Sequence, residues 1–151
     1  QFLRLPEEFV IKLDVDIKAE KEEDSNLILV GGPGTNLFTQ GINKHLPTRF
    51  KMQASEEGFM LDGLVSGNTS RVYTADTIGL VAKITNPWDK KRRIIVLAGN
   101  KAVGTKASVL ALTSFWRKVL KGYDGEEAFA RVVQGFDLDS DGKVDSIEVL
   151  E

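Results

Sequence analysis

Two short, uninterrupted apolar runs constrain the fold of this chain most strongly. Leu27 to Val30 stops at Gly31, and a second run inside Arg93 to Ala98 stops at Gly99. Runs of this length without polar residues are typical of strands buried on both faces, as in sheets covered by helices. A helical segment follows each glycine turn, so the pattern predicts two glycine-turn βα units in an α/β fold.

Three helices are expected, over residues 36 to 45, over residues 105 to 122, and from Asp124 or Glu126 onward. Pro47 terminates the first because proline cannot continue a helix. The second carries apolar residues up to Leu120 and stops at Gly122, which is a common helix terminator. The third precedes the apolar pair Val132 and Val133 and is short.

Strands are expected at the N-terminus and in the middle of the chain. From Phe9 to Ala19 apolar and polar residues alternate, which predicts a long strand with one buried face. Glycine-punctuated antiparallel strands are expected between Phe50 and Thr85, at Phe59 to Leu61, Arg71 to Thr74 and Leu80 to Ile84. Together these elements predict a mixed β-sheet sandwich with helices packed on it, in a single domain over residues 1–151.

The segment from Asp137 to Glu148 has the spacing of an EF-hand-like calcium loop. It fits D-x-[DN]-x-[DN]-G-x5-E at every specified position. Calcium takes six to eight oxygen ligands, and alternate carboxylates on a curled loop can converge on one ion. Gly142 permits the sharp turn, and Val144 is expected to point back into the core. The predicted ligands are Asp137, Asp139, Asp141, the carbonyl of Lys143, Asp145 and Glu148.

This loop is interpreted as a structural site and not as a switch. Sensor EF-hands change the angle between an entering and an exiting helix. Only three residues follow Glu148, so no full exiting helix fits. A solvated acidic segment without an ion is the alternative, but it would not require glycine and glutamate at these two positions.

Composition excludes several classes of function. The net charge is −2, and no basic face or tail indicates a nucleic-acid partner. No apolar run reaches membrane-spanning length. Cysteine is absent, so disulfides and thiolate metal sites are excluded. The sequence begins at Gln1 and not at methionine, which suggests a piece of a longer chain.

Other motifs are weaker. Gly31 to Asn36 follows a strand and could hold an anion, although a structural tight turn is favoured. Gly99 to Lys106 resembles a P-loop, but its last two residues are exchanged. His45 is expected at the surface, and Trp88 is expected to pack against other side chains. Asn68 begins a glycosylation sequon, Asn68-Thr69-Ser70.

The quoted motifs together resemble the C-terminal region of archaeal S-layer proteins. The matching segments are Leu27 to Asn36, Gly79 to Trp88, Ile95 to Thr105 and Arg131 to Glu151, and the last is the most specific. The resemblance implies a fragment of a secreted, glycosylated cell-envelope protein that binds Ca²⁺ and assembles with copies of itself in a lattice. Its partners are then those copies and other domains of the parent chain, and it has no enzymatic activity.

Two other functions remain open. A cell-wall glycan-binding module would use the surface around Trp88. An enzyme would bind a nucleotide or phosphate at the turn from Gly31 to Asn36.

Overall fold

The structure is a computed structural model that describes residues 9–151. Its elements up to β4 are α1 (Asp14–Glu20), β1 (Leu27–Val30), α2 (Leu37–Ile42), the 3-10 helix η1 (Asn43–His45), β2 (Arg49–Ser55), β3 (Gly58–Val65) and β4 (Val72–Tyr73). The remaining elements are β5 (Ile78–Thr85), β6 (Arg93–Gly99), α3 (Ala102–Ser114), α4 (Trp116–Val119), β7 (Phe129–Phe136) and β8 (Ser146–Val149).

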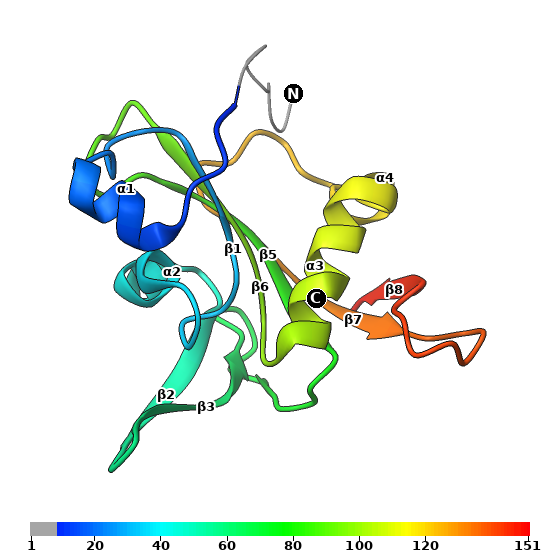
Figure 1. Cartoon of the computed structure of the whole chain (residues 1–151). Helices are drawn as coiled ribbons and strands as arrows, with labels where there is room; N and C mark the ends of the chain where they lie inside the picture. The colour runs from blue at the N-terminus through cyan, green and yellow to red at the C-terminus, as the bar shows by residue number, and fades with distance from the viewer. Residues whose placement is uncertain (1–8) are drawn as a thin grey trace.

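The strands form two sheets. The larger is mixed and has the order β1-β6-β5-β7-β8, in which β1 and β6 are parallel and the other neighbours antiparallel. The smaller is antiparallel, with the order β2-β3-β4. Helix α3 lies across one face of the large sheet, and the β2–β3 hairpin extends away from it (Figure 1). The prediction of a mixed α/β fold is therefore confirmed at this level.

The large sheet separates two apolar clusters. Residues on alternate positions of the central strands face α3 on one side, where Val81, Ile95 and Val133 are buried. On the other side, Leu80, Val96 and Val132 pack with α2 and the small sheet. Burial on both faces explains why β5, β6 and β7 carry long apolar runs.

Strand β1 differs from the expectation of full burial. Leu27 and Leu29 are buried, whereas Ile28 and Val30 are 46% and 53% exposed. The reason is position, since β1 lies at the edge of the sheet and α3 covers the inner strands. An apolar run without polar residues therefore does not distinguish a central strand from an uncovered edge.

The N-terminal strand prediction is wrong. Residues 9–13 have no regular structure and α1 follows them. Helix α1 buries no residue fully, although Ile17 packs partly against the core. Here Asp14 accepts a 2.7 Å hydrogen bond from the Leu37 amide at the start of α2. Tertiary contacts of this kind override a local period of two.

The short helix expected from Asp124 or Glu126 is also wrong. Residues 124–128 form no helix, and β7 follows, with Val132 and Val133 buried on opposite faces of the sheet. Short apolar runs fit either element, and here β7 completes the sheet between β5 and β8.

The two other helices are found with altered limits. The first is α2 followed by η1. The second begins at Ala102, earlier than expected, and is interrupted at Phe115 between α3 and α4. Past its end, Gly122 has a φ of 81°, a left-handed conformation that glycine adopts readily.

Candidate metal loop and the Glu151 cluster

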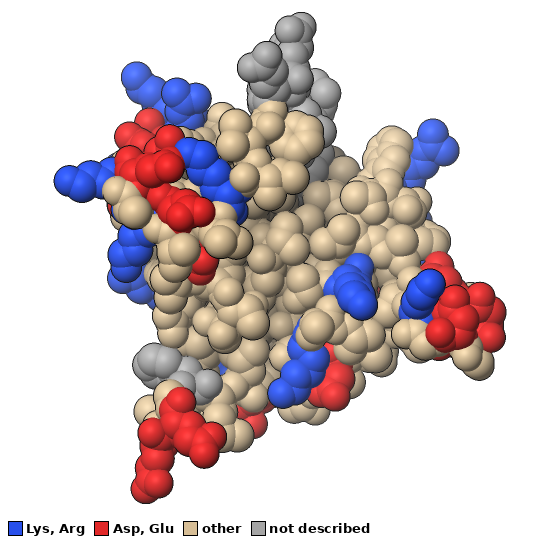
Figure 2. All heavy atoms as spheres, viewed as in Figure 1, with Lys and Arg blue, Asp and Glu red and all other residues tan. Residues whose placement is uncertain are grey.

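The loop between β7 and β8 gathers three carboxylates. Oxygen atoms of Asp137, Asp139 and Asp145 all lie within 4.8 Å of one another, and the three residues are exposed. Acidic side chains accordingly gather at the loop in Figure 2. A group of oxygen donors at this spacing has the chemistry that a hard divalent cation prefers.

Backbone amides hold the loop in its curled form. Asp137 accepts hydrogen bonds from the amides of Asp141 and Gly142, at 3.1 and 2.8 Å. Asp145 accepts from the amides of Leu138 and Asp139. Gly142 has a φ of 84°, so a residue with a side chain would be strained there.

The other predicted ligands lie outside the group of three carboxylates. Asp141 accepts a 2.8 Å hydrogen bond from the amide of Lys143, so its carboxylate is directed to its own backbone. Glu148 lies in β8, opposite Gln134 of β7, and is exposed. The loop is therefore followed by a strand, where an EF-hand has a helix.

The carboxylates of the loop affect one another. Asp139 accepts a hydrogen bond from the amide of Asp141, which lowers its pKa. Desolvation and the neighbouring carboxylates of Asp137, Asp145 and Asp141 outweigh that bond and raise the pKa overall. Burial alone would raise the pKa of Asp137. Hydrogen bonds from the amide of Gly142 and from neighbouring residues of the loop outweigh burial, so the pKa of Asp137 lies below its ordinary value. Like charges this close are the condition that a bound cation relieves.

The loop is anchored to the core beside it. Val144 is partly buried against the cluster under α3, and its side chain would meet any Cβ added at Gly135. The amide of Asp145 donates to the carbonyl of Phe136, and Ile147 is fully buried. Order in the loop is thereby linked to order in β7 and β8.

A second polar cluster, at Glu151, has no signal in the sequence. Its carboxylate accepts hydrogen bonds from the hydroxyls of Ser66, Thr69 and Tyr73. Burial opposes ionisation of Glu151, but these bonds outweigh it and hold its pKa below its ordinary value. Glu151 lies about eighty residues along the chain from the three hydroxyl residues, so no local motif could have identified the cluster.

The possible glycosylation site lies beside this cluster. Asn68 is exposed, and its amide donates to the hydroxyl of Ser66. Ser70, the hydroxyl residue of the sequon, has a φ of 58° in the same turn.

Directly after the turn from Gly31 to Asn36, the first amides of α2 are not free for an anion. At the start of α2, Asn36 accepts from the amides of Phe38 and Thr39. The Leu37 amide donates to Asp14. These amides are thus occupied, and the Asp14 carboxylate would repel a phosphate.

The P-loop-like segment is closed by its own backbone. A Cβ at Gly99 would lie 2.3 Å from the carbonyl carbon of Gly104, so these glycines are in close contact. Asn100 is buried and its side-chain amide donates to the carbonyls of Tyr73 and Ala75. This turn therefore has a structural role, in which it brings two backbone segments into close contact.

The aromatic and histidine candidates lie at the surface. His45 is exposed, as expected. Trp88 is 47% exposed and contacts Phe38 edge to face, with ring centroids 5.9 Å apart. It therefore packs on one side only.

None of the helices in the described part of the chain combines the length and apolar character that crossing a lipid bilayer requires.

Comparison with known proteins supports the resemblance noted above. The family model described as "S-layer like family, outer domain" matches residues 4–115. No curated protein and no solved structure matches the chain. The family match includes the N-terminal segment, which contributed little to the resemblance, and ends before the loop at 137–148, which contributed most. Because the match covers most of the sequence, the chain belongs to the S-layer like family.

Proposed function

We propose that this chain is a non-catalytic structural domain of an S-layer, stabilised by one calcium ion in the loop at residues 137–148. Family membership supports a structural role at the cell surface. The observation that carries the calcium proposal is the convergence of Asp137, Asp139 and Asp145 within 4.8 Å. Their spacing in the chain is that of a calcium loop.

The remaining ligands would complete the oxygen shell. Asp141 and the carbonyl of Lys143 belong to the same curled loop, and Glu148 follows in β8. Calcium tolerates irregular geometry and variable ligand number, so a loop that leads into a strand is compatible with binding.

The ion would act through the core contacts of the loop. Because Val144 and Ile147 pack under α3, an ion that binds only the ordered loop also favours the folded β7–β8 pair. At a calcium concentration a hundred times the dissociation constant, this linkage contributes about 2.7 kcal/mol. Extracellular modules of this kind bind with dissociation constants of about 10⁻⁴ to 10⁻³ M.

The same proposal specifies location and partners. The chain is secreted and forms part of an extracellular lattice with copies of itself and with other domains of its parent protein. Asn68 carries a glycan in that setting, because it lies exposed in a turn. The supporting observations are the family match and the exposure of the sequon.

Calorimetric titration at millimolar calcium tests the metal site. The expected result is one ion per chain, with binding lost in Asp139→Ala. Glu57→Gln, at the exposed turn between β2 and β3, is the matched control and leaves binding unchanged. Absence of binding by the wild-type chain at several millimolar calcium would refute the site.

A further inference from the structure

The segment before α1 exposes an unusual concentration of apolar side chains. Residues 9–13, which we call the N-terminal arm, contain four large apolar residues. The exposed fractions are 70% for Phe9, 75% for Val10, 89% for Ile11 and 68% for Leu13. Exposure of this kind in a contiguous segment marks an interaction site.

The arm has the sequence of a strand without the structure of one. Phe9, Ile11 and Leu13 alternate with Val10 and Lys12, the period of a half-buried strand. Among the described residues, no backbone hydrogen bond joins the arm to a sheet. Within residues 9–151, Lys12 of the arm forms ion pairs with Glu20 and Glu22, but the strand-like pattern has no partner in a sheet.

Strand β1 offers the complementary edge. It is the terminal strand of the large sheet, paired on one side only, with β6. Because the amide of Gly31 donates to Leu97 of β6, the backbone groups of Ile28 and Val30 point to the other side. The Val30 carbonyl accepts a 3.3 Å hydrogen bond from the Asn36 side-chain amide, so the amides of Ile28 and Val30 and the carbonyl of Ile28 form the template that this edge offers to another strand.

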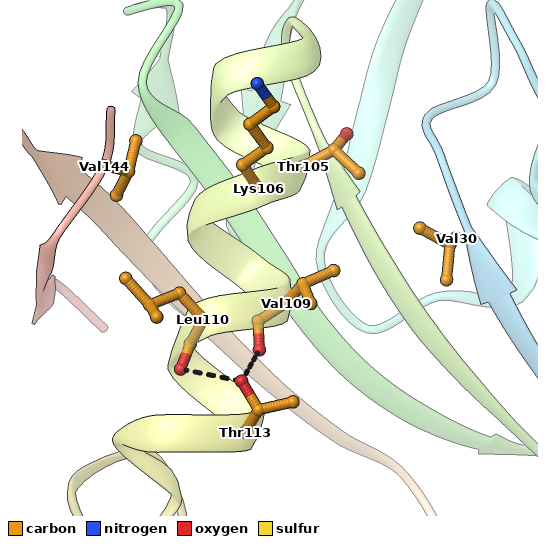
Figure 3. A pocket seen from close by; sticks show the side chains of 7 residues that line it. All are labelled: Val30, Thr105, Lys106, Val109, Leu110, Thr113 and Val144. Atoms are coloured by element: carbon orange, nitrogen blue, oxygen red, sulfur yellow. Dashed lines mark hydrogen bonds between the residues drawn. The ribbon is translucent and has the colours of Figure 1, made fainter. Parts of the chain in front are cut away.

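An apolar groove continues from this edge. It has a volume of about 340 Å³ and runs over α3, with Val30 of β1 at one end and Val144 of the β7–β8 loop at the other. Figure 3 shows Val109 of α3 pointing toward Val30, whereas Leu110 lies on the other side of the helix, toward Val144. A strand added beside β1 would place every second side chain on this same face of the sheet.

We propose that the N-terminal arm of one copy adds as a strand to β1 of a second copy, with Phe9, Ile11 and Leu13 on the groove side. The inference rests on the proposed function in one respect, that copies of the chain meet in a lattice. It identifies the surface by which they do so. Addition of a strand to an exposed sheet edge is an established mode of recognition.

The size of the interface agrees with a specific contact. When two copies exchange arms reciprocally, six large apolar side chains enter the grooves, and each buries on the order of 100 Å². The grooves and edges that they cover contribute a similar area. The total reaches the range of about 1,200–2,000 Å² that stable protein interfaces bury.

Disulfide trapping tests the exchange directly, because the chain has no cysteine of its own. Ile11→Cys in a mass-tagged copy is mixed with Val30→Cys in an untagged copy and oxidised, with calcium and with chelator. Phe9→Cys and Leu13→Cys test the neighbouring registers. The control partner is Met60→Cys, which is equally exposed but lies on β3.

The expected product is a tagged–untagged dimer, at least tenfold more abundant with Val30→Cys than with Met60→Cys. Sedimentation velocity of cysteine-free chains should show association that Ile11→Asp weakens at least tenfold and Met60→Asp leaves intact. A linkage that forms only within one chain carrying both Ile11→Cys and Val30→Cys would overturn the proposal. Equal trapping with Met60→Cys would also overturn the proposal. The same holds if Ile11→Asp sediments in the same way as the wild type. None of these three outcomes affects calcium binding at residues 137–148, so the two proposals fail separately.

Discussion

The phenol of Tyr73 donates a 2.7 Å hydrogen bond to the side-chain carboxylate of Glu151. Tyr73 lies in β4 of the small sheet, and the carbonyl of Glu151 accepts from the amide of Val132 in β7 of the large sheet. The contact therefore joins the two sheets. Glu151 follows β8, the strand that comes after the proposed calcium loop. Ser66 and Thr69, on either side of Asn68, also donate to its carboxylate, so the cluster connects this part of the chain with the turn that carries Asn68.

Removing the charge of Glu151 should weaken this connection. Glu151→Gln retains the shape but loses charge-assisted bonds from Ser66 and Tyr73. We expect a fall in the free energy of unfolding of about 1–3 kcal/mol, measured by urea denaturation. Glu127→Gln is the control because the Glu127 side chain is 81% exposed. An unchanged stability in Glu151→Gln would show that the cluster contributes nothing net.

The same cluster predicts a dependence of stability on pH. The pKa of Glu151 is lowered in the folded chain from its ordinary value of 4.5. Its contribution is therefore present above about pH 4.5 and is lost as the pH falls through the lowered folded value. Urea titrations between pH 6 and pH 3 should show a shallower loss of stability in Glu151→Gln than in the wild type. Identical slopes would contradict this assignment.

Close packing at Gly104 gives a third prediction. A Cβ there would lie 2.0 Å from the carbonyl oxygen of Ile78, which belongs to the backbone and cannot move aside easily. Gly104→Ala should cost roughly 3 kcal/mol or more. Gly41→Ala, in α2 with no atom within 4 Å of its Cβ, should raise stability by about 0.5–1 kcal/mol. Thermal unfolding of both variants distinguishes packing from helix propensity, and equal effects would contradict the packing argument.

The core strands of the fold could be predicted because their sequence reflects burial on both faces. Arg93 to Ala98 and Leu80 to Ile84 are strands as expected. The terminal elements could not be predicted. Val132 and Val133 fit a helix or a strand equally well until β5 and β8 are known to flank them.

The candidate sites also differ in whether the sequence alone identifies them. The loop at 137–148 is local, so its spacing alone identifies it as a candidate. The Glu151 cluster depends on chain crossings that bring residue 66 to residue 151, and no local pattern encodes them. The N-terminal arm is intermediate, because its sequence specifies a strand whose partner lies, on our proposal, in another copy.

Thermal unfolding with saturating calcium, and again with excess chelator, is the decisive test of whether an ion in the loop at 137–148 stabilises the fold. Stabilisation of about 2.7 kcal/mol corresponds to a rise in Tm of roughly 5–10 °C for a chain of this size. We expect calcium to produce this rise, chelator to reverse it and Asp139→Ala to abolish it. A Tm that is the same with calcium and with chelator would contradict the claim that an ion in this loop stabilises the fold.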